Sequence, residues 1–421
     1  MTDLPLLLLA GTGAILVAVL ILIVVPVRLV RGISLSMSFA LITFGGNDTA
    51  PDAVWQISLG AAIALLALAL LRSRAPVAGG KRFAAVAAFW GYVAIGALLA
   101  GSYSSNRMLL YFTLAVLAAF ITSSLNAAEL RTLYATIVVV AAVQIGFGLV
   151  EMVTHTAPVW GYRGGTRDNP FLNNLYARVQ GTMGHPIPFA MLQSIAFIVA
   201  WSNPARWKQG WRLIALGIAT GGLVISGTRS AVLAVAAAVM VHLALNRSLA
   251  AWVRTVFAVV AGTVVLLNID VGIVRIVEEL IASGSWTHRL GALESVSNLL
   301  ARPGLDAWFG SGFGSELLLY ERGYMQQHYL RVVDNMLVYA LGTMGIIGLV
   351  LFLTLWVVVF CLAGRTAKAL LVMMFVLFFS FDVLVWMYAG IVLSMIMTLP
   401  TPRQRVNGLV APQRALALRT V

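Results

Sequence analysis

Long apolar runs recur along nearly the whole chain, and they limit its possible folds more than any other feature. The chain has 421 residues, of which 61% are hydrophobic and only 10% are charged. A run of about 17–25 apolar residues can cross the hydrocarbon core of a bilayer as a helix. Membrane β-barrels instead show short segments of alternating hydrophobicity, which this sequence lacks. The pattern therefore predicts an all-α, polytopic integral membrane protein without a large soluble domain.

The apolar segments predict about 12 transmembrane helices. The last run is too long for one simple span and contains Asp382, so we expect it to fold as two helices. The segment 33–44 is short, which leaves open whether it crosses the membrane. The segments lie near 5–25, 33–44, 53–71, 84–101, 108–125, 132–153, 187–203, 213–227, 230–246, 253–270, 335–363 and 368–399.

Basic residues in the short connections set the predicted orientation. Such loops tend to stay in the cytoplasm, and here they are 72–82, 203–212, 246–254 and 364–368. Alternation then places two long loops outside, and the net charge of +13 reflects topology rather than a nucleic-acid partner. The predicted regions are N-terminal transmembrane helices 1–153, a periplasmic loop 154–186, transmembrane helices 187–270, a large periplasmic lid loop 271–334, C-terminal transmembrane helices 335–399 and a basic cytoplasmic tail 400–421.

The larger outer loop contains a predicted surface helix. Residues 287–301 place Leu290, Leu293, Val296 and Leu300 at helical intervals. This spacing predicts an amphipathic helix lying at the membrane surface. The following stretch RPGLDAWFGSGFGS is rich in Gly and Pro, so it should end that helix.

Arginines at the outer edge of the apolar segments are candidate anion ligands. Arg229 lies between two apolar runs that are separated only by GTRS. A guanidinium there needs a partner or water: it either reaches lipid phosphates or binds an anion in an outward cavity, where its planar fork suits phosphate oxygens. Arg163 and Arg178 lie in the first outer loop, and His185 directly precedes a predicted helix. Helix N-termini favour anions, although a tight Gly/Pro turn into the membrane explains the same residues.

Asp334 and Asn335 stand where the chain enters the apolar run 335–363. A carboxylate at a helix start is often an N-cap, which stabilises by about 1 kcal/mol. Alternatively, Asp334 acts as a general base or holds a nearby arginine in place. His328 and Arg331 precede it in the same loop. Metal-protease, Walker and nucleophile-elbow motifs are absent from the sequence, which therefore predicts neither a metal nor a cofactor.

The order of these motifs resembles the superfamily of O-antigen ligases and of O-antigen and exopolysaccharide polymerases of bacterial inner membranes. The resemblance covers roughly residues 175–360 and is carried by RVQGTMGHPIPFA, by Arg229 in GTRSAVLA, by Arg289 with Pro303 and GSGFG, and by DNMLVYALGTMGIIGL. Each motif is degenerate, and their order and topology supply the specificity.

The resemblance implies a membrane-embedded glycosyltransferase whose donor is a glycan on undecaprenyl pyrophosphate. An acceptor glycan or glycolipid attacks the anomeric carbon at the periplasmic face, and the lipid pyrophosphate leaves. Membrane lipids and a chain-length regulator are the other expected partners. Arg229 and Arg289 are the expected diphosphate ligands, assisted by Arg178, and their charge would stabilise the leaving group. The apolar helices would hold the polyprenyl tail.

One departure bears on the choice within the superfamily. Ligases of the family carry a histidine before the Asn of the closing motif, whereas this chain has Asp334 there. We therefore expect a polymerase that joins surface polysaccharide repeat units. The alternatives are a ligase that transfers the glycan to lipid A-core or protein, and a transporter of lipid-linked sugars.

Overall fold

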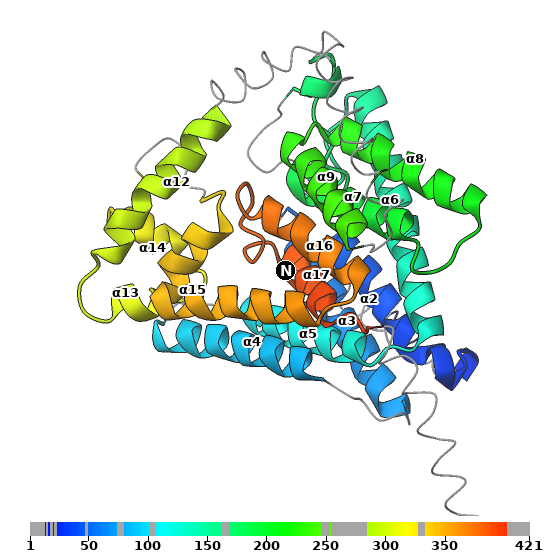
Figure 1. Ribbon diagram of the computed structural model, residues 1–421, viewed down its shortest axis with the longest axis horizontal. Helices are drawn as coiled ribbons and strands as arrows, with labels where there is room; N and C mark the ends of the chain where they lie inside the picture. The colour runs from blue at the N-terminus through cyan, green and yellow to red at the C-terminus, as the bar shows by residue number, and fades with distance from the viewer. Residues whose placement is uncertain are drawn as a thin grey trace, which may run out of the picture.

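The computed structural model describes residues 23–46, 49–73, 80–101, 106–161, 168–172, 174–245, 284–326 and 333–401, with isolated positions at 13, 16, 20 and 253. The side chains of 106–107 and 284–289 lie outside this description. Within these ranges the chain is helical and forms no named strand (Figure 1). A single bridge pairs Asp168 with Ala177.

The helices follow one another along the chain with short connections in the N-terminal half. They are η1 (Val27–Leu29), α2 (Val30–Gly45), α3 (Asp52–Arg72), α4 (Lys81–Leu99), α5 (Asn106–Ser123), α6 (Ala127–Thr154), η2 (Pro170–Leu172), α7 (Pro186–Ser202), α8 (Gln209–Ser226) and α9 (Arg229–Ala244). After residues outside the description come α12 (Gly284–Leu300), α13 (Asp306–Phe309), α14 (Glu316–Glu321), α15 (Met336–Leu362), α16 (Arg365–Leu377) and α17 (Met387–Thr398).

Several helices are suited to a membrane, in agreement with the predicted all-helical membrane class, whereas the predicted number of about 12 transmembrane helices stays a prediction. By length and composition, five of the described helices could cross a bilayer: Val27–Gly45, Asp52–Arg72, Lys81–Leu99, Ala127–Thr154 and Met336–Leu362. Four described apolar segments are shorter: Met108–Ser123, Pro186–Ser202, Arg229–Ala244 and Met387–Thr398. The last predicted run does divide in two, because residues 378–386 separate α16 from α17.

The segment 33–44, which looked short in the sequence, belongs to a longer helix that also includes a charged residue, and that charge is paired. α2 extends back to Val30 and includes Arg31. The Nη2 of Arg31 donates to Glu129 Oε2 at 3.1 Å, and its Nε donates to Oε1 at 3.3 Å. Both side chains are almost fully buried. Glu129 also accepts from the Asn126 backbone N–H in a capping box at the start of α6. The pair lets a charged residue belong to an otherwise apolar helix.

Contacts between helix ends show which ends lie together at each of the two ends of the bundle. At one, here the Arg82 end, Arg82 at the start of α4 donates to the carbonyl of Met397 at the close of α17. At the other, the Arg178 end, the hydroxyl of Thr182 donates to the carbonyl of Thr43 in the last turn of α2. The start of α17 lies at the Arg178 end, because Met387 shares a small cavity with Thr43.

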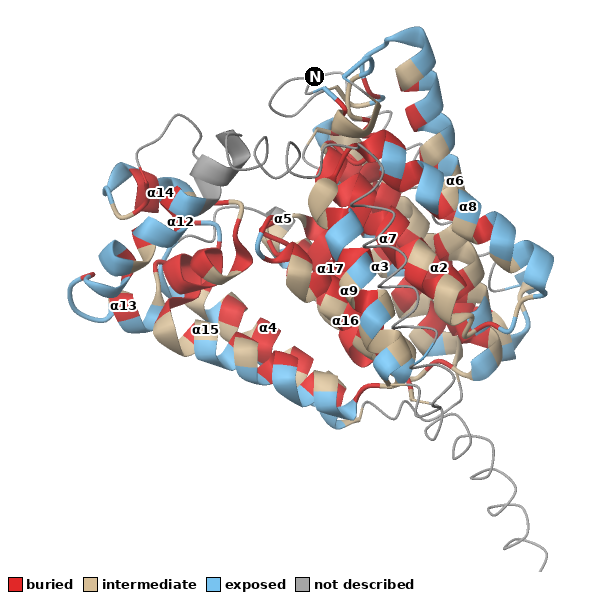
Figure 2. Ribbon diagram, turned by 45° about the horizontal axis from the view of Figure 1, so that its top comes forward, coloured by how far each residue is buried: buried red, intermediate tan, exposed pale blue. Residues whose placement is uncertain are grey.

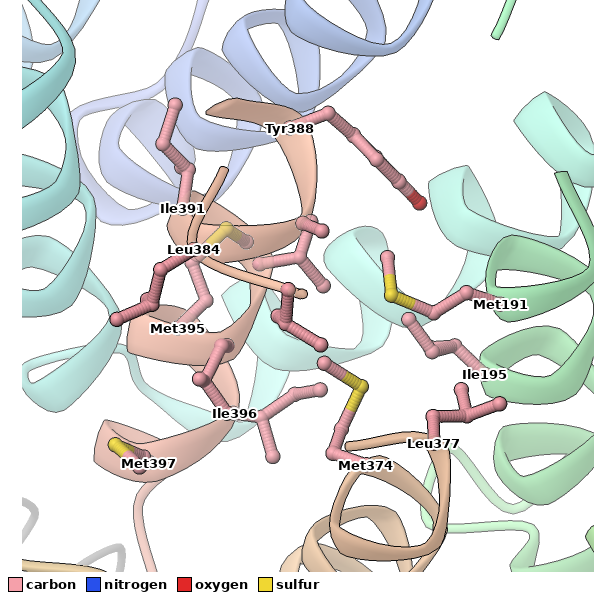
Figure 3. Close-up of a cluster of buried hydrophobic side chains, with 14 of the residues drawn as sticks. Met191, Ile195, Met374, Leu377, Leu384, Tyr388, Ile391, Met395, Ile396 and Met397 are labelled. Atoms are coloured by element: carbon pink, nitrogen blue, oxygen red, sulfur yellow. The ribbon is translucent and has the colours of Figure 1, made fainter. Parts of the chain in front are cut away.

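Buried apolar side chains fill the centre of the bundle. Figure 3 shows Met191 and Ile195 of α7 facing Met374 and Leu377 of α16. Side chains from α17 and the segment before it complete the cluster. Because these residues are packed by neighbouring helices, α7, α16 and α17 form an inner layer that holds the helix ends in position.

α15 is broken in its first half, where one regular helix was expected. Gly345 has φ 68° and ψ −172°, a conformation outside the helical region. A break at this depth leaves the last carbonyls of the preceding turns without helical partners. Arg302 donates hydrogen bonds to two of these carbonyls. Its Nη2 donates to Leu341 O and its Nη1 donates to Gly342 O, both at 2.8 Å. The Gly312 N–H donates to Thr343 O at 2.9 Å.

The fourth carbonyl at the break is satisfied from α4. The hydroxyl of Tyr92 donates to Met344 O at 2.8 Å. Gly310 and Gly345 meet backbone to backbone, and a Cβ on Gly345 would overlap the Trp308 carbonyl. The glycine-rich stretch after α12 therefore packs against the middle of a helix. The expectation that 271–334 forms a periplasmic lid stays a prediction.

The segments α12, α13 and α14 cover the first half of α15. α12 buries Ala292, Ser295 and Leu299, and Leu299 lies with Leu319 of α14 against Gly342. Figure 2 shows this half of α15 as buried. The predicted stripe of leucines on α12 stays exposed at Leu290, Leu293 and Leu300, so a different face of the helix packs against the protein.

Replacing Glu129 by Gln should destabilise the protein strongly. The substitution leaves the Arg31 guanidinium buried without its counter-charge, which typically costs about 3–5 kcal/mol. The midpoint of unfolding in a mild-detergent/SDS titration measures the effect. Arg131→Gln, on the exposed side of the same helix, serves as the control, and equal midpoints for both variants would contradict the role of the pair.

Gly345→Ala should destabilise by about 2 kcal/mol or more. Its backbone conformation is accessible essentially to glycine alone, at a penalty of about 1–3 kcal/mol for other residues, and the added methyl group meets the Trp308 carbonyl. The matched control is Gly217→Ala in α8, where a Cβ meets open space. That control should be neutral or mildly stabilising, because alanine favours a helix interior. Thermal unfolding in detergent compares the two.

Candidate functional site

The loop before α7 is fastened to α6 by buried polar side chains. Glu151 Oε2 accepts from the backbone N–H of Gln180 at 3.3 Å and of Gly181 at 3.1 Å. Gln144 accepts from the Thr182 N–H at 3.0 Å and donates to its hydroxyl at 2.6 Å. These bonds fix the GTMG turn at the Arg178 end.

Arg178 joins this loop to the break between α8 and α9. Its Nε donates to the carbonyl of Ser226 at 3.0 Å, and its Nη2 donates to the hydroxyl of Thr228 at 2.8 Å. Asn169 donates to the carbonyls of Val224 and Ile225 in the same turn. The guanidinium is therefore held at a fixed place by the end of α8.

Arg229 follows Thr228 directly and is the first residue of α9. Its side chain is half-buried. The structure thus brings together two of the predicted arginines, one held by Thr228 and the other adjoining it in the chain. The N-terminus of a helix carries partial positive charge, which adds to that of the arginines. An anion at this place would meet positive potential from three sources.

His185 is the N-cap of α7. Its Nδ1 accepts from the Ile187 backbone N–H at 3.2 Å, which requires that nitrogen to be unprotonated. Its ring centroid lies 5.7 Å from that of Trp386, in the segment between α16 and α17. Pro186 follows His185 in the chain, and the Thr228 hydroxyl donates to its carbonyl at 3.4 Å. The beginnings of α7 and α9 and the segment 378–386 therefore meet at the Arg178 end.

Asn335, not Asp334, caps α15. The Asn335 side-chain oxygen accepts from the backbone N–H groups of Leu337 at 3.0 Å and Val338 at 3.2 Å. Asp334 is half-buried and has φ 44°, a left-handed conformation that Asp and Asn adopt more readily than most residues. The Met336 N–H donates to the carbonyl of Phe378, so this turn lies against the same 378–386 segment. Capping does not explain the Asp334 carboxylate.

Tyr320 of α14 lies within electrostatic range of three acidic residues, one of which is Asp334. Burial raises the pKa of Tyr320 well above its ordinary value, and the negative charges of Asp334, Asp382 and Glu316 raise it further. Asp382 is buried. Acidic side chains from α14, the turn before α15 and the segment after α16 therefore all act on Tyr320. In that last segment, the ring centroids of Phe381 and Trp386 are 5.8 Å apart.

Not every predicted site residue can be placed. Arg163, His328 and Arg331 lie outside the described residues. Arg289 belongs to α12, whose backbone is described there while its side chain is not. The expected meeting of Arg289 with Arg229 stays a prediction.

Sequence reasoning missed four residues that build the site. Glu151 and Asp382 were visible as rare charges in apolar segments, a signal that marks functional or structural polar groups. Thr228 and Trp386 carried no comparable signal, because their roles depend on helices that pack together from distant parts of the chain.

An apolar cavity of about 430 Å³ lies beside this site, between α2 and α3. Phe44, Val54, Ile57 and Trp160 are among the residues that line it. The Trp160 indole N–H donates to the Phe44 carbonyl at 2.8 Å. Thr43, the neighbour of Phe44, accepts from Thr182 of the Arg178 loop, so the cavity adjoins the polar site.

Among the side chains that the structure describes, no group of three or more His, Cys, Asp or Glu residues is arranged to hold a metal ion. No model of a known protein family matches the chain, and a search of curated proteins found no match.

His185→Asn should preserve folding, whereas His185→Ala should lose about 1 kcal/mol of stability. Asparagine can accept the same backbone N–H as an N-cap and alanine cannot. Thermal unfolding in detergent separates the two variants. Equal losses in both would show that the ring contact with Trp386, rather than the cap, is what His185 contributes.

Proposed function

We propose that the protein is a membrane glycosyltransferase that polymerises surface polysaccharide repeat units carried on undecaprenyl pyrophosphate. The observation that carries the proposal is the placement of Arg178 and Arg229 together at the N-terminus of α9. Guanidinium groups and a helix N-terminus are typical ligands of phosphate oxygens. The resemblance of the motifs to the polymerase and ligase superfamily supports the same conclusion.

The arginines would bind the diphosphate of the donor. Negative charge develops on the leaving phosphate as the bond to the anomeric carbon breaks, and fixed positive groups stabilise that charge without the need for a metal. The bonds from Arg178 to Ser226 and Thr228 hold it in place, so little rearrangement is needed. Arg289 on α12 would bind the diphosphate as a third arginine, from the proposed lid loop.

The apolar cavity between α2 and α3 supports a place for the lipid tail. A polyprenyl chain needs an apolar surface next to its charged head group. The cavity adjoins the Arg178 loop through Thr43 and Thr182. The head group and the start of the tail would therefore occupy neighbouring sites.

Asp334 would act on the acceptor. Its carboxylate is not used as the helix cap, which Asn335 provides. Its charge, like those of Asp382 and Glu316, acts on Tyr320 of α14, so three acidic residues lie within electrostatic range of one tyrosine. We assign Asp334 to accept the proton of the attacking sugar hydroxyl or to orient Arg331. The site faces the periplasm in a bacterial inner membrane, with the Arg82 end in the cytoplasm, as the basic loops indicate.

The purified full-length protein, mixed in liposomes with lipid-linked repeat units, tests the proposal. A ladder of products without another acceptor is expected. Transfer only after lipid A-core or protein is added would instead identify a ligase. Movement of the lipid-linked units across the bilayer without any new glycosidic bond would overturn the enzyme assignment and identify a transporter.

Arg229→Ala should lower the rate of this reaction about 100-fold or more, as removal of a group that stabilises developing charge does. Arg229→Lys should be nearly as damaging, because an ammonium cannot reproduce bidentate contacts; the same is expected of Arg289→Lys. Asp334→Asn keeps the left-handed backbone and should also lose activity. Arg131→Ala, at the Arg82 end, is the control. Normal rates in Arg229→Lys would contradict bidentate phosphate binding.

A further inference from the structure

We propose that α13 is inserted into the interface of the lipid bilayer and anchors the lid loop there, with Leu305, Trp308 and Phe309 in contact with lipid. This inference does not depend on the reaction catalysed. These three side chains are 69%, 52% and 49% exposed in a segment only five residues long. Large apolar side chains gathered on an exposed surface mark an interaction site. The depth of α13 identifies lipid as the partner.

The depth follows from the contacts of α4. Tyr92 of α4 donates to the carbonyl of Met344, and a Cβ at Gly348 would touch the Tyr92 ring. These contacts place the break in α15 level with Tyr92 or slightly beyond it. α4 continues to Leu99, about 10 Å further at 1.5 Å per residue. Since Gly310, next to α13, packs on Gly345, α13 lies near the level at which α4, a candidate span, ends (Figure 1).

The exposed surface of α13 continues that of the neighbouring spans. Before its break, α15 is covered by α12 to α14, and after the break its outer side is exposed at Val350 and Leu351. On α4, Leu98 and Leu99 are exposed at the end of the helix. In the proposed arrangement, lipid covers the exposed side of α15 after its break. The outer face of α13 then contacts the same lipid.

The backbone of this segment meets the requirement for entering a membrane. Irregular backbone is tolerated at that depth only where its polar groups are paired within the protein. The N–H of Gly310 donates to the Asp306 carbonyl, and the next two N–H groups donate to Gly342 and Thr343 of α15. Asp306, the charged residue of α13, lies 3.8 Å from Arg322. Tryptophan is the residue type most suited to the boundary between head groups and hydrocarbon.

Spin labels at single cysteines test the insertion in the full-length protein reconstituted into liposomes. Trp308→Cys and Phe309→Cys are made in a Cys361→Ser background, which removes the native thiol. Val350→Cys is the control for lipid, and Glu321→Cys, on the exposed side of α14, is the control for water. The ratio of collisions with oxygen to collisions with a water-soluble nickel complex reports depth.

The expected result is a ratio at Trp308 and Phe309 that is several-fold higher than at Glu321 and approaches that at Val350. A ratio equal to that at Glu321 would place α13 in water and overturn the proposal. Labels that are immobilised and inaccessible to both reagents would show a protein partner or a second copy on this surface, which also overturns it. Thermal unfolding of each labelled variant confirms that it is folded, and the second position keeps the test decisive if one variant fails to fold.

Discussion

The structure depends on one constraint: a polypeptide backbone cannot break a helix at membrane depth unless each freed carbonyl finds a donor. α15 breaks at Gly345, and donors from three elements converge on the open turn: the buried Arg302 guanidinium, the backbone after α13, and Tyr92 of α4. Burial lowers the pKa of Arg302, and the negative charge of Asp306 opposes that shift. The Arg302 side chain thereby ties the segment after α12 to α15, the helix that Asn335 caps.

At the Arg178 end, the backbone groups that need partners are the N–H groups at the beginnings of helices. There the free N–H groups at the beginnings of α7 and α15 are capped by His185 and Asn335. The beginning of α9 carries Arg229 instead, beside Arg178. Side chains accept hydrogen bonds from the free N–H groups at the start of two of these helices. At the start of the third, α9, two arginines add further positive charge. The start of α17 at this end also lacks a side-chain cap. The two arginines, rather than the missing cap alone, are therefore why the donor diphosphate is proposed to bind at the break between α8 and α9.

Apolar length and charge placement in the sequence predicted the all-helical membrane class and the division of the last run at Asp382. The Gly345 break was not predicted, because the run 335–363 is continuously apolar and glycine is common in membrane helices. Arg302 appeared to be one loop arginine among several, and only the packing of α13 on α15 shows its role. At the site, Arg178, Arg229 and His185 were found by their positions at the edges of apolar runs. Thr228 and Trp386 could not be, since neither residue type is unusual where it stands.

The ion pair between Arg31 and Glu129 has a consequence for how the chain is made. The two residues are 98 positions apart, so α2 leaves the ribosome well before its counter-charge exists. Arg31 lies in the first turn of α2, and a buried arginine without a counter-charge is costly. The buried pair can therefore form only after the start of α6 has been synthesised.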